Sequence, residues 1–281
     1  MKTPSPLVST AWLAARLSEP EVRVADASWY LPQAGRDANA EYAAAHIRGA
    51  AFFDIDDLSD ETSPYPHMLA PAPKFAERMQ NLGLGSDDLI VVYDGAGVYS
   101  SPRAWWMLRA MGHRNVFVLD GGLPKWRREG RPIDDRVAQP PPRTFAAKPD
   151  KTILRDFRQM MDNVETRAAQ VVDARGRPRF TAREPEPRPG VRGGHMPGSL
   201  NVPYTELTGA DGTLKSADAL RALFAERRVD LSAPVVTSCG SGVTAATVML
   251  ALEIAGAKNV ALYDGSWSEW GARADAPVET G

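Results

Sequence analysis

Short apolar runs rich in β-branched residues alternate with helix-like patterns along the chain. In the first half, Leu89–Tyr93 and Val116–Leu119 are predicted to be buried strands. Pro102–Met111 between them is predicted to be a helix, because a proline stands in its first turn and Gly112 follows its end.

The second half has the same pattern. Val235–Ser238 and Val260–Tyr263 are the predicted strands, and Thr244–Ala255, followed by Gly256, is the predicted helix. Strand, helix and strand at this spacing predict an α/β fold, with a parallel sheet flanked by helices. Sites in such sheets form at the carboxyl ends of strands, and Cys239 is the first residue after one of these ends.

The two halves are an internal repeat. "VRVADASW" returns as "QVVDARGR", "AAAHIRGAAFFDID" as "RGGHMPGSLNVPYTEL", "LIVVYDGAGVYSS" as "PVVTSCGSGVTAA", and "GHRNVFVLDGGLPKW" as "GAKNVALYDGSWSEW". The matches keep their order at a spacing of 144 to 149 positions, as in the pairs Asp26 and Asp173, His46 and His195, Asp94 and Cys239, and Trp126 and Trp270. The sequence therefore predicts two domains of one fold in tandem.

A segment rich in proline and charge, "EGRPIDDRVAQPPPRTFAAKPDK", lies between the repeats. It has no sustained hydrophobic period, which predicts an extended linker. We expect an N-terminal domain at residues 1–132, the linker at 133–151 and a C-terminal domain at 152–281.

The composition argues against several classes of partner. The 33 basic and 35 acidic residues leave a formal charge of −2, which gives no electrostatic footprint for nucleic acid or a membrane surface. At the N-terminus, Ser9 and Thr10 look like a cap for a helix over Ala11–Leu17 rather than part of a secretory signal. A single cysteine cannot form an internal disulfide, so we expect a cytoplasmic protein. We expect no cofactor and no metal site.

The loop after the predicted strand Val235–Ser238 suits thiol chemistry. A thiolate is stabilised at the N-terminus of a helix, where backbone N–H groups have no partner within the helix. Cys239 is followed by Gly240, Ser241, Gly242, Val243 and Thr244, which supply five consecutive N–H donors. We call residues 240–244 the amide cradle. Its two glycines allow the tight turn that would bring these donors around an anionic sulfur.

Two plainer interpretations compete with this one. A lone cysteine is most often a small buried hydrophobic residue, and a glycine-rich turn can simply bind a phosphate. The repeat acts as an internal control, because Gly95 and Gly97 give the first half the same loop with Asp94 in place of Cys239. The N-terminal domain is therefore predicted to be non-catalytic.

The same control sorts the other polar residues. His46 and His195 occupy matching positions in both halves and are interpreted as structural. Asp120 and Asp264 are likewise interpreted as turn-forming.

The chain resembles the two-domain rhodanese-type sulfurtransferases over essentially its whole length. The resemblance rests on the duplicated domain, on "CGSGVT", and on "DASWYLP", "GAAFFDID", "TSPYPHML", "LDGGLPKW", "REPEPRPG" and "YDGSWSEW". It implies that Cys239 takes a sulfur atom from a donor, holds it as a persulfide, and passes it to cyanide or to a thiol such as thioredoxin. Both the thiolate and the persulfide are anions that N–H donors stabilise.

The resemblance also implies a donor. Thiosulfate-type members carry basic residues directly after the cysteine, whereas this chain has Gly240 and Ser241, which resemble the 3-mercaptopyruvate type. The family's two substrate arginines fall on Arg179 and Arg188, and an arginine fork matches a carboxylate. Neither has an evident counterpart in the first half. Three nearby arginines are interpreted as solvated surface charges: Arg175, Arg177 and Arg183.

A proposed relay of the family maps onto Ser241, His67 in "SPYPHML" and Asp56 in "FFDID". It would protonate the enolate of pyruvate or orient the donor. His67 and Asp56 lie in the first half, so the resemblance implies a site between the domains. A histidine satisfied within its own loop is the alternative for His67.

Three rival functions would each require a different feature. A phosphatase of this fold would need a C-x5-R loop, but the arginine position is Ala245. A thiosulfate sulfurtransferase would differ in donor preference. A non-catalytic sulfur carrier should lack the cysteine or the donor site, whereas this chain has Cys239 and the arginine pair.

Overall fold

The computed structural model describes residues 5–137 and 140–281, and the chain forms two compact units. Unit 1 consists of residues up to Ser59, of Leu69–Asp150 and of Gly209–Leu214. Unit 2 consists of Asp60–Met68, Lys151–Thr208 and Lys215–Gly281. Each unit thus contains one repeat and a short segment from the other.

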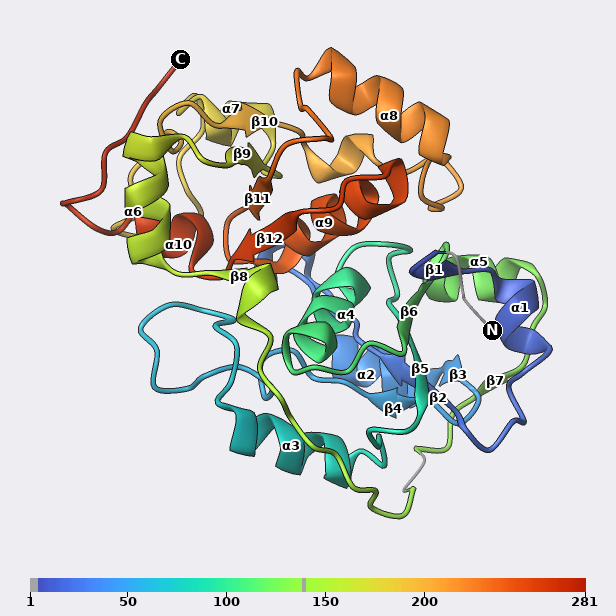
Figure 1. The fold of residues 1–281 in the computed structure, drawn as a ribbon. Coiled ribbons are helices and arrows are strands. Elements are labelled where there is room, and N and C mark those ends of the chain that lie inside the picture. The colour runs from blue at the N-terminus through green and yellow to red at the C-terminus, as the bar shows by residue number, and fades with distance from the viewer. Residues whose placement is uncertain (1–4, 138–139) are drawn as a thin grey trace. The chain divides into compact units, whose positions relative to one another are not determined.

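Unit 1 alternates strands and helices, as Figure 1 shows. Its elements are β1 (Leu7–Val8), α1 (Thr10–Ala14), β2 (Val22–Asp26), the 3₁₀ helix η1 (Pro32–Ala34), α2 (Ala38–Ala44), β3 (His46–Ile47), β4 (Ala51–Phe52), α3 (Ala72–Asn81), β5 (Leu89–Tyr93), α4 (Ser101–Ala110), β6 (Val116–Leu119), α5 (Gly122–Arg128) and β7 (Ile133–Asp134).

Unit 2 repeats this alternation. Its elements are η2 (Lys151–Ile153), β8 (Leu154–Arg155), α6 (Phe157–Thr166), β9 (Gln170–Asp173), α7 (Arg177–Phe180), β10 (Leu200–Asn201), η3 (Tyr204–Glu206), α8 (Ala217–Glu226), β11 (Val235–Ser238), α9 (Val243–Ala255), β12 (Val260–Tyr263) and α10 (Ser266–Trp270).

The two main sheets have one topology. The strand order is β4-β2-β5-β6-β1 in unit 1 and β10-β9-β11-β12-β8 in unit 2, and every pairing is parallel. The third strand in this order is β5 in unit 1 and β11 in unit 2. The loop with Asp94 follows β5, and the loop with Cys239 follows β11. Both domains are therefore α/β domains with a parallel sheet flanked by helices, as the sequence predicts.

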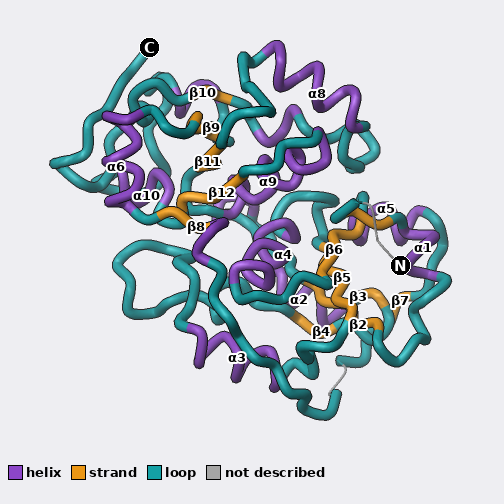
Figure 2. The backbone as a smooth tube through the Cα atoms, in the orientation of Figure 1, coloured by secondary structure: helices purple, strands orange, loops and turns teal. Residues whose placement is uncertain are grey.

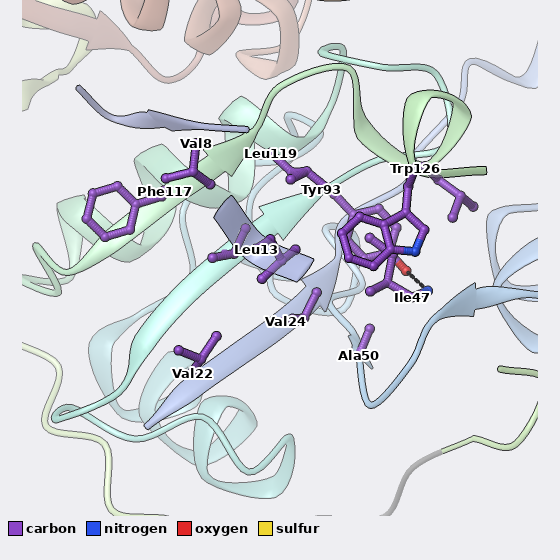
Figure 3. Close-up of a cluster of buried hydrophobic side chains, with 12 residues drawn as sticks. Val8, Leu13, Val22, Val24, Ile47, Ala50, Tyr93, Phe117, Leu119 and Trp126 are labelled. Carbon is purple, nitrogen blue, oxygen red and sulfur yellow. Dashed lines mark hydrogen bonds between the residues drawn. The ribbon is translucent and has the colours of Figure 1, made fainter. Parts of the chain in front are cut away.

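The core of unit 1 lies where β2, β5 and β6 face α1 and α5. Figure 3 shows Val24, Leu13, Phe117 and Trp126 packed among its buried side chains. Tyr93 also lies in this cluster, and its hydroxyl accepts a hydrogen bond of 3.1 Å from the backbone N–H of Ile47. The strands are buried because β-branched and aromatic side chains cover this face of the sheet.

The core of unit 2 is also rich in aromatic side chains. Trp267 and Trp270 are fully buried together with Tyr263 and Met160. Helix α9 packs against β11, β12 and α8, and nearly all of its residues are buried, as expected for a helix without a polar face.

The predicted strands have the predicted bounds, and two helices differ by one residue. Helix α4 runs from Ser101 to Ala110, and α9 begins at Val243. The N-terminal helix is shorter than predicted and ends at Ala14, because the amide of Arg16 bonds to Leu13 and tightens the last turn. Its predicted cap is present, since Ser9 accepts a hydrogen bond from Trp12.

The segment predicted to be the linker, residues 133–151, belongs to unit 1 in its described part up to Asp150, and Lys151 belongs to unit 2. Its first two residues form strand β7, which pairs with β3. Ala138 and Gln139 lie outside the described residues. Residues 140–150 have no helix or strand, but Phe145 is buried with its ring centroid 5.8 Å from that of Phe75. Arg143 pairs with Asp88 at 2.8 Å. Backbone hydrogen bonds add to these contacts, among them those from the N–H of Lys148 to the Met111 carbonyl at 2.8 Å and from the N–H of Asp150 to the Ala110 carbonyl at 2.7 Å. A buried ring, ion pairs and backbone hydrogen bonds thus hold a chain that composition alone predicts to be extended.

The two exchanged segments follow matching places in the repeats. Residues 60–68 come after the loop that follows β4 and belong to unit 2. Residues 209–214 come after the equivalent stretch of the second repeat and belong to unit 1, where the amide of Leu214 donates to Asp120 at 2.9 Å. Figure 2 shows that the chain between β4 and α3 is loop throughout.

Asp120 therefore does more than shape its own turn, because its carboxylate anchors one of the exchanged segments.

Across residues 5–137 and 140–281, the helices are too short or too polar to cross a membrane.

Candidate active site

Cys239 lies in the loop that directly follows the central strand of the second sheet. Strand β11 pairs with β9 on one side and β12 on the other, so its carboxyl end opens at the middle of the sheet edge. The residue is 2% exposed. Its backbone is held by α10, since its N–H donates to Ser266 Oγ at 3.2 Å and its carbonyl accepts from the N–H of Trp267 at 2.9 Å.

The amide cradle leads straight into a long helix. Gly242 adopts a left-handed φ of 82°, and α9 begins at Val243. The first N–H groups of this helix have no acceptor within it. The turn thus places the N-terminus of α9, the positive end of the helix dipole, four residues after Cys239. Burial alone is also compatible with an inert cysteine, so the residues around Cys239 must distinguish a reactive cysteine from an inert one.

The matching loop of unit 1 shows what this kind of turn can hold. The Asp94 carboxylate is fully buried and accepts hydrogen bonds of 2.8 to 3.0 Å from the backbone N–H groups of Ala96, Tyr99, Ser100 and Ser101. A carboxylate is an anion, so this repeat wraps its loop amides around a negative charge. Cys239 stands at the equivalent position of unit 2.

Ser241 is in hydrogen-bonding contact with His67. The His67 Nδ1 to Ser241 Oγ distance is 2.9 Å, and both side chains are buried. The segment 60–68 belongs to unit 2, which explains how a residue of the first repeat reaches this loop. His67 has a left-handed φ of 61°, a conformation that non-glycine residues rarely adopt. Strain of this kind is often found at functional sites.

Asp56, the third member of the predicted relay, belongs to unit 1. Its side chain is exposed and accepts a hydrogen bond of 3.1 Å from the indole N–H of Trp29. The predicted relay is thus represented within unit 2 by the pair of Ser241 and His67.

Arg179 lies over the cradle. A Cβ placed on Gly240 would be 3.1 Å from Arg179 Nη2, so a larger residue would push the guanidinium away by a few tenths of an ångström. The guanidinium forms an ion pair with Glu186, whose side chain is 3% exposed. Glu186 therefore fixes an arginine beside the residue that follows the cysteine.

Arg188 approaches the same loop through a serine. Its Nη1 donates to Ser268 Oγ at 3.3 Å, and that hydroxyl donates to the carbonyl of Gly240 at 2.6 Å. The backbone N–H of Ser268 donates to the same carbonyl at 2.8 Å. Two arginines thus converge on Gly240, one directly and the other through Ser268.

The interpretation of Arg175 as a solvated surface charge is wrong. Its side chain is 1% exposed, stands 4.3 Å from the Trp267 ring centroid, and pairs with Asp173 and Glu186 at 2.7 Å each. Burial lowers the pKa of this guanidinium, but the two carboxylates outweigh it and the net pKa is raised. A sequence pattern does not distinguish an arginine that neutralises buried carboxylates from one in water. Arg177 and Arg183 are exposed.

Arg179 does have a counterpart in the first repeat, contrary to the expectation from the sequence. Arg36 pairs with Glu41 through two hydrogen bonds of 2.8 and 2.6 Å and donates to the carbonyl of Gly95 at 3.3 Å. Gly95 is equivalent to Gly240. The loops around these arginines differ in sequence, which hides the match until the fold aligns them.

Four residues that the sequence analysis did not select belong to this site: Glu186, Tyr204, Ser266 and Ser268. The repeat offered a signal for the two serines, because Gly122 and Pro124 replace them in the first half. Tyr204 replaces Ile55 in the same way. Burial raises the pKa of Tyr204, Cys239 raises it further and Arg179 lowers it, so the phenol lies near both groups.

The two matching histidines are structural, as interpreted. His46 Nδ1 contacts the Tyr42 carbonyl at 2.8 Å, and His195 Nδ1 contacts the Phe180 carbonyl at 2.9 Å. Each imidazole stacks on the aromatic ring of the residue to which it is bonded.

Comparison with known proteins agrees with this fold. The model of the rhodanese-like domain matches the chain twice, at residues 9–129 and 154–273. The chain belongs to the rhodanese family. The two matched stretches are the two repeats, so this is a tandem rhodanese protein with the cysteine in its second domain.

Several rhodanese-family relatives match over nearly the full length. The chain is 48% identical to human 3-mercaptopyruvate sulfurtransferase, covering 95% of this chain and 92% of the human protein. It is 46% identical to the 3-mercaptopyruvate sulfurtransferase of Escherichia coli K12, covering 97% of each. Rat thiosulfate sulfurtransferase is 43% identical, covering 98% of this chain and 94% of the rat protein.

A solved rhodanese structure supports the same architecture. The crystal structure of SseA from Escherichia coli, described as a 3-mercaptopyruvate sulfotransferase, superposes with a TM-score of 0.87 at 42% identity. The match covers 94% of this chain and 99% of that one.

Proposed function

We propose that the protein is a 3-mercaptopyruvate sulfurtransferase that works through a persulfide on Cys239. The single observation that carries the proposal is the position of Cys239 in a loop whose counterpart wraps its amides around the Asp94 carboxylate. A loop built to hold an anion suits the thiolate before sulfur transfer and the persulfide after it.

The first step is attack of the Cys239 thiolate on the sulfur of 3-mercaptopyruvate. The S–S bond forms as the C–S bond breaks, and the electron pair of that bond stays on carbon as the enolate of pyruvate. The proton of the donor thiol ends on this carbon. Ser241 and His67, which are 2.9 Å apart, can carry it.

The second step returns the enzyme to its starting state. A nucleophilic acceptor attacks the outer sulfur of the persulfide, the S–S bond breaks, and Cys239 leaves as thiolate. Cyanide would leave as thiocyanate, and a dithiol such as thioredoxin would leave as a disulfide with release of sulfide. Both acceptors remain predictions, as does the cytoplasmic location.

The donor site is proposed to lie between the two arginines. Arg179 and Arg188 converge on Gly240, and a guanidinium pairs well with a carboxylate. 3-Mercaptopyruvate has one carboxylate and a ketone, so two cationic groups suffice. Relatives named for this donor are 46 to 48% identical and the thiosulfate relative is 43% identical, which favours the first donor by a small margin.

A comparison of two donors tests the proposal. Arg188→Ala should reduce kcat/KM for 3-mercaptopyruvate about 30-fold or more, since a charge-assisted hydrogen bond contributes ~2 kcal/mol, and should change thiosulfate use far less. Arg183→Ala is the matched control, because that arginine is exposed in the same loop. Equal losses on both donors would remove Arg188 from carboxylate recognition. A parent protein that prefers thiosulfate would defeat the assignment.

A further inference from the structure

Unit 1 contains a cavity of about 410 Å³ beside its own loop. Its lining consists of Arg36, Glu41, Ala44, Gly95, Leu123, Pro124 and Arg127. All of these residues belong to unit 1. The volume lies within the range of small-molecule sites.

The cavity occupies the place in the first repeat that the candidate active site occupies in the second. Gly95 matches Gly240, and Pro124 matches Ser268. The pair of Arg36 and Glu41 stands at Gly95 as the pair of Arg179 and Glu186 stands at Gly240. The first domain therefore keeps an arginine–glutamate pair without the cysteine.

The charge of the lining favours one kind of ligand. Arg36 and Arg127 are both cationic, while Glu41 is the one acid of the lining, and its pKa is lowered mainly by the hydrogen bond from Arg36. Arg127 is exposed, and within the described parts of the chain it makes one hydrogen bond, of 3.3 Å to the carbonyl of Ala45. One positive charge of the lining is thus left over.

The remaining walls are apolar. Ala44, Leu123 and Pro124 line the cavity together with Gly95, and none of these residues is charged. A site with one surplus cation and an apolar wall suits a monoanion with a short carbon chain. Reaction is not expected there, because the Asp94 carboxylate already accepts the loop amides.

We propose that unit 1 binds a small monocarboxylate in this cavity, with the carboxylate on Arg127 and the carbon chain on Leu123 and Pro124. This site is separate from the sulfur-transfer site and has no thiol. Pyruvate, which is a short monocarboxylate, is the probe.

The test is NMR titration of pyruvate into the Cys239→Ser protein with labelled leucine methyl groups. The Leu123 methyl signals, assigned with Leu123→Ile, should shift and saturate. Arg127→Gln should weaken this binding about tenfold, as expected for a lost charge-assisted hydrogen bond. Arg131→Gln is the control, because Arg131 pairs with Glu129 and is not part of the lining.

Three results would overturn the proposal: no saturable shift at Leu123, an equal shift with sulfate at the same ionic strength, or unchanged binding in Arg127→Gln. Binding at Leu123 that survives Arg188→Gln would support an independent site, and its loss there would contradict one. Since the protein used cannot form a persulfide, these outcomes do not depend on the proposed sulfur transfer.

Discussion

At the scale of residues, equivalent positions of the two repeats solve the same electrostatic problem differently. Asp173 in unit 2 is neutralised by Arg175 at 2.7 Å. Its counterpart Asp26 has Ser28 at the place of Arg175, and burial raises the pKa of Asp26 to about 6. A buried carboxylate without a cation is costly to ionise.

This difference predicts a pH-dependent gain from Asp26→Asn. Because the folded pKa is raised, Asp26 contributes stability that is full below about pH 4 and lost as the pH rises through about 6. Asparagine mimics the protonated form, so the variant should match the parent protein in acid. Above pH 6 it should be more stable by on the order of 2 kcal/mol. Denaturant unfolding at both pH values measures this, and a variant less stable at both would contradict it.

A second residue-scale prediction concerns Tyr204. Its phenol interacts electrostatically with Cys239 and Arg179, and burial raises its pKa, so it is a neutral donor at physiological pH. Tyr204→Phe should therefore slow alkylation of Cys239 by iodoacetamide and lower kcat about tenfold, with little change in KM. Tyr65→Phe, in the segment 60–68 of the same unit, is the control. An unchanged alkylation rate would show that the phenol does not act on the sulfur.

At the scale of elements, the segment 60–68 completes the Cys239 loop with a residue from the other repeat. His67 is held in a left-handed conformation at 2.9 Å from Ser241. His67→Asn should keep this backbone, because asparagine tolerates positive φ, while losing the imidazole. We expect kcat to fall about 100-fold, as for loss of a general acid or base, with a small change in unfolding free energy.

The matched variant is His195→Asn, which removes the imidazole that contacts the Phe180 carbonyl and stacks on its ring. It should lower stability without a specific loss of kcat. If His67→Asn behaves in the same way as His195→Asn, the role of His67 is structural.

The strands and long helices of the fold could be predicted from sequence because each is a local pattern. Leu89–Tyr93 and Val235–Ser238 have the predicted bounds since β-branched runs between turn signals are sufficient to define them. The order of strand, helix and strand made the parallel topology predictable as well. The two-residue strands, such as β10, could not be predicted, because two residues are too few to show a hydrophobic period.

Much of the candidate site depends on contacts that no local pattern contains. The buried network of Asp173, Arg175 and Glu186 needs the folded loop to bring residues together. That residues 60–68 belong to unit 2 depends on tertiary contacts. The match of Arg36 to Arg179 is likewise visible only once both loops are folded.

At the scale of the whole molecule, the two repeats carry equivalent loops with different contents. Unit 1 fills its loop with its own carboxylate, and unit 2 presents a thiol. One chain should therefore hold one transferable sulfur atom, although it has two rhodanese-like domains.

The most direct measurement is the intact mass of the protein after incubation with 3-mercaptopyruvate and removal of the donor. The account predicts a gain of one sulfur atom per chain with release of pyruvate, no gain in Cys239→Ser, and an undiminished gain in Asp94→Asn. A parent protein that takes up no sulfur, or a Cys239→Ser protein that takes up as much as the parent, would contradict it.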